Sequence, residues 1–390
     1  MRILVAPDSY KLTLDSASAA RVIADAARAV FGQAHVDECP VADGGEGTLA
    51  VWANATGAAL TQVPACDVFG APVVCPVATD PRTGIVLIEA AHTCGLPPRS
   101  RRDPDRSLSL GLGLVLRAVL EGDPDARIRI ALGGTGTVDG GLGAALALGM
   151  RLEDAGAPFQ PSGLLALPEE FRITFDNPFR DAPVFLCDTR VPLFGPGGAV
   201  PVFGPQKGVG PQRIPLYEAA LERLMRAAAR VTGRPFVDAP GLGAAGGIAA
   251  LFSLLGSATC TSGAKYLLEV LRFEQRATLA DLVVTGEGCL DATSFSGKIV
   301  GEIADVCRRV GRPLLILPGR CRLNPDRLPA HLVVRPTTTA SAPEPESRPA
   351  DSADPAAPAN NMVKALLYDT AHFAFRDFSK KQLFPSGRFC

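Results

Sequence analysis

Carboxylates, hydroxyls and glycines are concentrated at five points of the sequence, each directly after a short run rich in β-branched residues. In a parallel α/β sheet, ligands bind beyond the carboxyl ends of the strands, so residues at such points are candidates for chemistry. We therefore expect the five segments to converge on one crevice. They are residues 8–11, 43–48, 133–141, 188–190 and 285–291.

Lysine usage indicates what these loops bind. Only seven of the 39 basic residues are lysines, yet Lys11, Lys207 and Lys298 lie in strand-end or glycine-rich loops. A compact ammonium among backbone N–H groups suits a phosphate, because glycine lets the main chain approach the anion. Neighbouring carboxylates suit Mg²⁺, which takes one or two protein carboxylates together with phosphate oxygens. The combination predicts phosphoryl transfer, in which positioning and charge neutralisation supply most of the catalysis.

Each motif also has a plain structural alternative. An Asp-Gly-Gly sequence is typical of a turn, and a strand-end aspartate, Thr135 or Thr137 equally serves as a helix cap. No GxxxxGK[ST] loop occurs in the chain, which excludes an ordinary P-loop kinase. Residues 241–246 fit the dinucleotide pattern GxGxxG, but they follow Asp-Ala-Pro rather than a strand, so helix packing is the favoured interpretation.

The alternation of short β-branched runs with longer helical stretches predicts an α/β fold with a parallel sheet. Strands and helices alternate at both ends, whereas residues 60–65, 73–78 and 84–90 are extended runs without long helices between them. We therefore predict a discontinuous Rossmann-like domain, residues 1–60 and 265–390, with a second α/β domain inserted at residues 61–264. Further strands are predicted over residues 2–6, 35–41, 127–132, 184–187, 282–285, 314–317 and 331–334, and helices over 16–31, 216–231, 244–255, 264–273, 298–310 and 361–375.

Composition excludes several classes of protein. A net charge of −1 lacks the basic excess of a nucleic-acid-binding protein. Residues 240–264 carry no charge, but they are mostly Gly, Ala, Ser and Thr, which predicts a buried helix rather than a membrane span. The ten cysteines include no CxxC pair, so we expect reduced thiols in a cytoplasmic protein. The Pro-rich residues 339–358 are predicted as a flexible loop.

Six segments, taken in order, carry a resemblance to a known family. They are Ala-Pro-Asp-Ser-Tyr-Lys at 6–11, Ala-Asp-Gly-Gly-Glu-Gly-Thr at 42–48, Gly-Gly-Thr-Gly-Thr-Val-Asp-Gly-Gly at 133–141, Val-Phe-Gly-Pro-Gln-Lys-Gly at 202–208, Gly-Ala-Ala-Gly-Gly at 243–247, and Thr-Gly-Glu-Gly-Cys-Leu-Asp at 285–291 with Ser-Gly-Lys at 296–298. Together they resemble the class I bacterial glycerate kinases, which phosphorylate D-glycerate with ATP and usually form 2-phosphoglycerate. The resemblance implies a Rossmann-like domain and a second α/β domain, with the active site in the cleft between them.

The chain departs from the family pattern at three places. Leu12-Thr13 replaces the usual Gly-Ser, while Val138 and Val191 stand where the family usually has asparagine. Valine neither donates nor accepts a hydrogen bond through its side chain. Two alternatives therefore stay open: a kinase of another small hydroxy acid, or a catalytically impaired sensor of the same fold. An NAD-dependent hydroxy-acid oxidoreductase that uses residues 241–246 is a second alternative.

The resemblance and the strand-end positions together assign expected roles, with ATP and Mg²⁺ as cofactors. Asp188 is the first choice for the carboxylate that accepts or orients the hydroxyl proton of glycerate, and Asp8 is the second. Lys11 and Lys207 complete the catalytic set by neutralising charge. Glu287 and Asp291 are the candidate metal ligands, and a homodimer is compatible with the sequence. The candidate substrate- and phosphate-binding residues are Ser9, Asp43, Gly44, Gly45, Gly134, Thr135, Thr137, Asp139, Gly286, Gly288 and Lys298.

Overall fold

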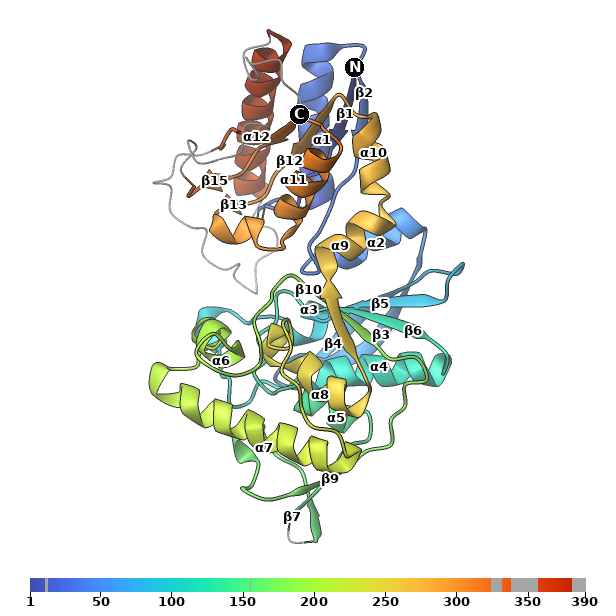
Figure 1. Cartoon of the computed structure of the whole chain (residues 1–390), viewed down its shortest axis with the longest axis vertical. Coiled ribbons are helices and arrows are strands. Elements are labelled where there is room, and N and C mark those ends of the chain that lie inside the picture. The colour runs from blue at the N-terminus through green and yellow to red at the C-terminus, as the bar shows by residue number, and fades with distance from the viewer. Residues whose placement is uncertain (11–12, 155, 324–331, 338–356, 381–390) are drawn as a thin grey trace. The chain divides into compact units, whose positions relative to one another are not determined.

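The computed structural model describes residues 1–10, 13–154, 156–323, 332–337 and 357–380, and it is a mixed α/β structure with parallel sheets, as predicted (Figure 1). By its internal contacts the chain falls into two units. The first holds the described residues up to Asp43 and from Ala264 onward, and the second holds those from Gly44 to Gly263. The domain boundary predicted after residue 60 lies inside the second unit by this division.

The first unit is built on a five-stranded sheet in which every pair of neighbouring strands is parallel. Its strands, in spatial order, are β16 (Leu332–Val334), β14 (Leu314–Ile316), β12 (Leu282–Thr285), β1 (Arg2–Val5) and β2 (His35–Glu38). Strand residues alternate between two cores: Leu4 and Val283 pack on one side, Ile3 and Val284 on the other. The helices are α1 (Ser16–Phe31), α9 (Gly263–Val270), α10 (Phe273–Leu279), α11 (Ile299–Arg309) and α12 (Ala357–Ser379).

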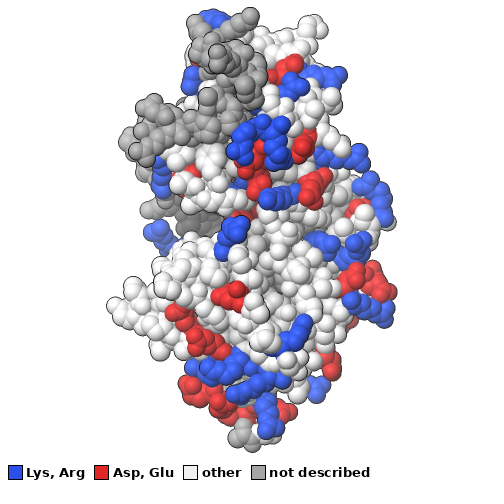
Figure 2. Space-filling view, in the orientation of Figure 1, with Lys and Arg blue, Asp and Glu red and all other residues white. Residues whose placement is uncertain are grey.

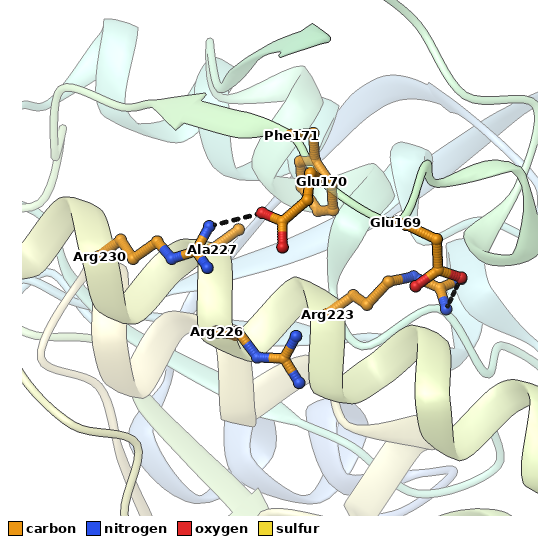
Figure 3. Close-up of a pocket in the computed structure, with 7 residues that line it drawn as sticks. All are labelled: Glu169, Glu170, Phe171, Arg223, Arg226, Ala227 and Arg230. Atoms are coloured by element: carbon orange, nitrogen blue, oxygen red, sulfur yellow. Dashed lines mark hydrogen bonds and ion pairs between the residues drawn. The ribbon is translucent and has the colours of Figure 1, made fainter. Parts of the chain in front are cut away.

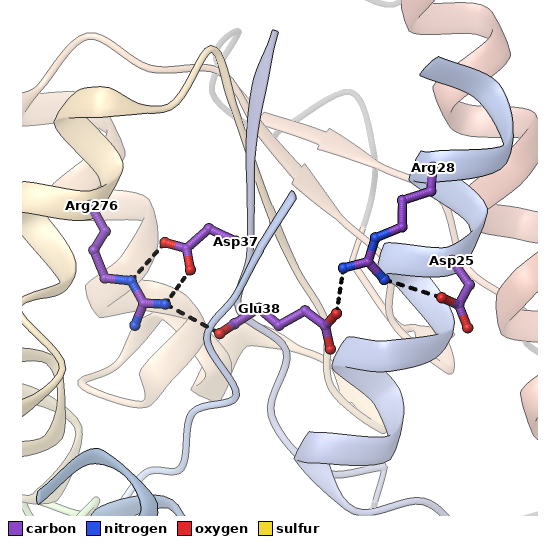
Figure 4. A network of polar contacts seen from close by, with 5 residues as sticks. All are labelled: Asp25, Arg28, Asp37, Glu38 and Arg276. Carbon is purple, nitrogen blue, oxygen red and sulfur yellow. Dashed lines mark hydrogen bonds and ion pairs between the residues drawn. The ribbon is translucent and has the colours of Figure 1, made fainter. Parts of the chain in front are cut away.

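Two arginines tie helices of this unit to the edge strand β2 (Figure 4). Arg276 of α10 forms a bidentate pair with Asp37, with Nε 2.8 Å from Oδ2 and Nη2 2.5 Å from Oδ1. Arg28 of α1 donates to Glu38 at 2.7 Å and to Asp25 at 3.2 Å. These contacts hold α1 and α10 against β2, because a planar guanidinium fits a carboxylate with two parallel hydrogen bonds.

The second unit is built on a six-stranded sheet with the order β11, β10, β6, β5, β4, β3. The first four strands are parallel to one another. Strand β4 pairs antiparallel with β5, and β3 pairs antiparallel with β4. The strands are β3 (Ala59–Cys66), β4 (Pro72–Thr79), β5 (Ile85–Glu89), β6 (Arg127–Ala131), β10 (Val184–Cys187) and β11 (Thr259–Ser262), and the longer helices are α2 (Thr48–Thr56), α4 (Leu110–Gly122), α7 (Ile214–Thr232) and α8 (Ile248–Leu255).

A small antiparallel sheet accompanies α7 in this unit. It consists of β7 (Arg151–Asp154), β8 (Ala157–Phe159) and β9 (Arg172–Thr174). Figure 3 shows Arg223 and Arg230 of α7 pairing with Glu169 and Glu170, at 3.1 and 2.9 Å. The ion pairs join α7 to the chain just before β9. Since two of the arginines around this shallow surface pocket are neutralised, we assign no ligand to it.

The elements differ from the prediction at several places. The helix predicted over residues 244–255 corresponds to the buried α8, but it begins later, because a short 3₁₀ segment occupies Ala244–Gly246. The uncharged stretch 240–264 is not one helix throughout, since Thr259–Ser262 form β11 beside β10. Glycines at positive φ, such as Gly241 and Gly247, end helical geometry there. Helix α4 and the small sheet were not predicted. The predicted helix 361–375 lies within α12, and the predicted Pro-rich loop falls almost wholly outside the described residues.

Two expectations from composition can be compared with the described residues. No helix among them combines the length and the apolar character needed to cross a membrane. Their nine cysteines are all free, and six of these are buried. On the visible face in Figure 2, basic and acidic side chains are interspersed rather than gathered into one basic field.

Candidate functional site

In the first unit, the segments after β1 and β12 lie side by side at the carboxyl edge of the five-stranded sheet. The amide of Asp8 donates to the carbonyl of Gly286 at 2.8 Å, and the hydroxyl of Thr285 donates to the carbonyl of Ala6 at 2.7 Å. A Cβ at Gly286 would lie 2.2 Å from the hydroxyl of Tyr10, so only glycine fits this approach. The Tyr10 hydroxyl in turn donates to Leu317 O, at the end of the next strand. Two of the predicted segments therefore meet.

Glu287 follows β12 at this edge and is half-buried. Its Oε1 atom is shielded from solvent and has no hydrogen-bond partner among the described residues. Burial raises the pKa of Glu287 to about 7; a hydrogen bond from Ser294 and the charge of Lys298 oppose the shift, and the charges of Asp291 and Asp43 add to it. The structure thus brings the predicted residues Asp43, Glu287, Asp291 and Lys298 into one neighbourhood.

The short 3₁₀ segment Ala292–Phe295 organises the remaining polar groups there. Asp291 caps it by accepting hydrogen bonds from the amide and hydroxyl of Thr293, at 2.8 and 2.6 Å. Lys298 donates to the same Thr293 hydroxyl at 3.0 Å. One oxygen of Asp291 is therefore already engaged, whereas Glu287 Oε1 is not.

These residues fit a magnesium ion that is shared with phosphate. Among the residues that the structure describes, no group of three or more His, Cys, Asp and Glu side chains could hold a metal alone. Mg²⁺ does not require such a group, because it keeps several waters and binds one or two carboxylates plus phosphate oxygens. An unpartnered carboxylate oxygen on Glu287 among other acidic groups is the type of ligand that a cation satisfies.

The raised pKa of Glu287 predicts a pH dependence of stability. An unfolded glutamate has an ordinary pKa, so the stabilising contribution of Glu287 is fully present below about pH 4.5 and is lost as the pH rises through about 7. We expect Glu287→Gln to remove this loss and to raise the free energy of unfolding at pH 8 by roughly 2–3 kcal/mol. Urea unfolding between pH 5 and 8 measures the free energy of unfolding of both proteins, and Glu222→Gln, at an exposed position, is the control. If the free energies of wild type and Glu287→Gln changed in parallel with pH, the prediction would be contradicted.

In the second unit, the loops at residues 44–48 and 133–141 are in direct contact. The Gly133 amide donates to the Gly44 carbonyl at 3.0 Å, and a Cβ on Gly133 would lie 2.3 Å from the Cα of Gly45. Gly44 has φ +101°, and a Cβ there would lie 3.3 Å from the carbonyl of Leu186 in β10. The loops therefore meet each other and the end of β10, and glycine is what allows this approach.

Substituting Gly133 tests this contact. We expect Gly133→Ala to destabilise the protein by about 1–3 kcal/mol, because the new methyl group meets backbone of the other loop rather than a movable side chain. If the chain catalyses the phosphoryl transfer that the sequence predicts, that activity should fall at least tenfold even in the folded fraction, since both loops must shift. Gly122→Ala at the end of α4 is the matched control, because a Cβ there meets nothing within 4 Å. Equal melting temperatures for the two variants would show that the loops do not touch.

Asp139 holds the second of these loops together from inside. It is 1% exposed and accepts hydrogen bonds from the amide and hydroxyl of Ser109, both at 2.8 Å, and from the amides of Gly141 and Gly143 at 3.2 and 3.0 Å. Four donors occupy its two oxygens, so the side chain stabilises the loop that presents Gly134 and Thr135.

Lys207 reaches the same loop from a different segment. It ends the 3₁₀ segment Pro205–Lys207, is only 4% exposed, and donates from Nζ to the Thr137 carbonyl at 2.8 Å. Burial lowers the pKa of Lys207 to about 8, against the opposing charge of Asp139. A buried ammonium with a single hydrogen bond inside the described chain is poised to take an anion as a further partner.

The glycine-rich segment at 241–247 packs on this loop. The carbonyl of Gly246 accepts a hydrogen bond from the amide of Gly140 at 3.0 Å, and a Cβ at Gly246 would lie 2.1 Å from the Thr137 carbonyl. Thr137 donates from Oγ1 to the Ala245 carbonyl at 3.3 Å, so it does not cap a helix. The segment follows turns rather than a strand. Its glycines thus allow close packing of the chain, which agrees with packing rather than dinucleotide binding as the interpretation of the GxGxxG pattern.

The predicted site residues fall into two groups, one in each unit. Asp188 directly follows β10 and is half-buried. Lys11 lies outside the described residues. The group of the first unit is Asp8, Ser9, Asp43, Gly286, Glu287, Gly288, Asp291 and Lys298, and the group of the second is Gly44, Gly45, Gly134, Thr135, Thr137, Asp139, Asp188 and Lys207.

Sequence reasoning missed Glu89. It is the last residue of β5, is 2% exposed, and accepts hydrogen bonds from the amides of Gly47 and Leu49. A charged residue that ends the apolar run Ile-Val-Leu-Ile was the available signal. The site thus contains a carboxylate that accepts a hydrogen bond from Gly47 in the loop at 44–48, although the two residues are 42 positions apart in the sequence.

Comparison with known proteins decides the family. The model of the glycerate kinase family matches residues 3–363, which is most of the chain. The chain belongs to the glycerate kinase family. It is 33% identical to a glycerate kinase of Bacillus subtilis and 34% identical to a glycerate 2-kinase of Escherichia coli, covering in both cases 82% of this chain and 85% of the relative.

A solved structure supports the same assignment for the fold. The crystal structure of a protein assigned as glycerate kinase 2 from Salmonella typhimurium matches with a TM-score of 0.77 and 28% sequence identity. The match covers 98% of this chain and 99% of that chain. As a member of the glycerate kinase family, this chain is a kinase that acts on a small molecule and uses a nucleotide.

Proposed function

We propose that this glycerate kinase family member transfers the γ-phosphoryl group of ATP to the C2 hydroxyl of D-glycerate, which gives 2-phosphoglycerate and ADP. The observation that carries the proposal is the buried ammonium of Lys207, whose one hydrogen bond within the described residues goes to the Thr137 carbonyl of a glycine-rich loop. Desolvating an ammonium is costly; the charge of Asp139 offsets part of that cost, and an anionic ligand would offset more of it. The phosphate and the carboxylate of the reactants supply such anions.

In the proposed reaction, the C2 hydroxyl oxygen forms a bond to the γ-phosphorus while the bond from that phosphorus to the bridging oxygen breaks. Asp188 accepts or orients the hydroxyl proton, with Asp8 as the second candidate. Lys207, Lys298 and Lys11 neutralise charge on the phosphates and on the glycerate carboxylate. Magnesium, when bound by Glu287 with Asp291 as the second candidate ligand, would neutralise phosphate charge.

The valines that depart from the family pattern bear on the substrate. Val138 is 1% exposed and packs in the core of the second unit. The carbonyl of Val191 accepts hydrogen bonds from the amides of Gly241 and Gly243, at 3.2 and 3.0 Å. Val138 thus has a packing role and Val191 a backbone role, and whether their side chains change the substrate is decided by the assay with several hydroxy acids.

A coupled ADP-release assay with D-glycerate, L-glycerate, glycolate and tartronate tests the proposal. Turnover with D-glycerate at the highest kcat/KM is expected. Turnover with another of these acids alone would replace D-glycerate by that acid, and ATP binding without any turnover would favour the sensor. The proposal extends to a cytoplasmic location, which the free thiols support, and to a homodimer, for which sedimentation is the test.

A further inference from the structure

Glu89 makes an unusual connection between a strand and a helix of the second unit. Its Oε1 accepts a hydrogen bond from the Gly47 amide and its Oε2 from the Leu49 amide, both at 3.1 Å. These amides lie at the N-cap and in the first turn of α2, where backbone N–H groups have no acceptor inside the helix. One buried carboxylate therefore joins the end of β5 to the start of α2.

Within the described residues, helix α2 has no other side-chain cap. Its N-cap is Gly47, which has no side chain and has φ +91°. The hydroxyl of Thr48, the first residue of the helix, is buried and finds no hydrogen-bond partner in the described part of the chain. Glu89 consequently performs the function that Ser, Thr, Asp or Asn performs at an ordinary N-cap, but it does so from a different strand.

The position of Glu89 matters because of what the capped loop touches. Residues 44–47 contact Gly133 through the Gly44 carbonyl, and they approach the end of β10 through Gly44. A change at the Gly47 amide would therefore be transmitted to the loop that carries Thr137, the acceptor for Lys207, and to the strand that precedes Asp188.

We propose that Glu89 is a positioning residue for phosphoryl transfer: its carboxylate fixes residues 44–47, and its protonation loosens them. The inference rests on the proposed function for its reaction, although the hydrogen bonds themselves do not. An ionised carboxylate accepts from both amides, whereas a protonated carboxyl presents one O–H donor toward an N–H group and loses one of the two bonds.

The surroundings of Glu89 determine when this happens. Among the described residues, the charged or titratable groups that face it are Glu46 in the loop and Cys75 in β4, and His92 lies beside Glu46. Burial raises the pKa of Glu89 to about 7, with the two amide hydrogen bonds opposing the shift and Glu46 adding to it. Since the carboxylate ionises as the pH rises through about 7, the fixed loop predominates on the alkaline side.

The variant Glu89→Gln tests the proposal, because glutamine has one acceptor oxygen and so mimics the protonated carboxyl. At pH 8 we expect kcat/KM for D-glycerate to fall about 10- to 100-fold, mainly through kcat. The ratio of wild type to variant should shrink toward one as the pH is lowered to 6. The matched control is Asp80→Asn: Asp80 is 2% exposed and accepts from the Arg82 amide at 2.9 Å in the turn before β5, so its variant should keep wild-type activity at each pH.

A ratio that stays constant from pH 6 to 8, or an unchanged kcat/KM at pH 8, would overturn the inference. A second measurement is independent of turnover and of the folding of the variant. In wild-type protein labelled with ¹⁵N at glycine and leucine, the Gly47 and Leu49 amide signals should titrate together near pH 7. If wild type does not phosphorylate glycerate, the proposed function fails, but a titration of the two amide signals would still support the contact between Glu89 and the loop. If the two amide signals do not titrate near pH 7, the inference itself fails.

Discussion

Replacing Asp188 by asparagine is expected to lower kcat for glycerate phosphorylation by about 10²- to 10⁴-fold, the range that a positioned general base contributes. Asp188 directly follows β10, and the neighbouring Leu186 carbonyl lies against Gly44. Asparagine keeps the size of the side chain but cannot accept the hydroxyl proton. The KM values for glycerate and ATP should therefore change much less than kcat.

The control for Asp188→Asn is Asp181→Asn. Asp181 lies shortly before β10, on the other side of the strand in sequence, is 63% exposed, and has Arg127 3.8 Å away as its ion-pair partner. We expect this variant to retain wild-type kcat, since exposed pairs of this kind contribute little. A kcat within threefold of wild type for Asp188→Asn would contradict the assignment and would direct attention to Asp8.

The second large effect is expected at Lys207. Replacing it by methionine, which has a similar length, removes the buried ammonium and should lower kcat/KM at least 100-fold through weaker phosphate or carboxylate binding. The free energy of unfolding should change little, because the hydrogen bond lost to Thr137 is offset by relief of a desolvated charge. Loss of activity without loss of stability distinguishes a functional lysine from a structural one.

The pKa of Lys207 predicts the direction in which the free energy of unfolding changes with pH. Burial lowers this pKa to about 8, so the cost of the buried charge is present below pH 8 and disappears as the pH rises above it. Wild type should therefore gain stability relative to Lys207→Met between pH 8 and 10. Lys265→Met, at a lysine whose side chain is 63% exposed, is the control and should leave kcat/KM unchanged. Unchanged kcat/KM in Lys207→Met would contradict the role of Lys207.

Much of the fold was predictable from local sequence. Strand β1 and helix α1 were predicted because a β-branched run is followed by apolar residues at helical spacing, and Asp15 caps α1 by accepting from the Ser18 amide at 2.8 Å. Helix α4 was missed, since glycines at 111 and 113 interrupt its pattern. They are tolerated because Gly113 packs against Ala144, where a Cβ would lie 2.3 Å from the carbonyl, a contact that sequence does not reveal.

The candidate site was predictable as a set of loops but not as a set of contacts. The glycine-rich loops were recognisable because close backbone approach requires glycine, and the structure brings residues 44–48 against Gly133. The burial of Lys207 and the capping role of Glu89 depend on partners 70 and about 40 residues away in sequence. Such partners are determined by sheet topology, and no local pattern encodes them.

The most direct test of the central claim is phosphorus NMR of the product that the wild-type protein forms from ATP and D-glycerate. The account predicts a phosphomonoester signal that coincides with added 2-phosphoglycerate and grows in step with ADP. A signal that coincides with 3-phosphoglycerate would contradict transfer to the C2 hydroxyl. Release of inorganic phosphate without any organic phosphate would contradict kinase activity on glycerate.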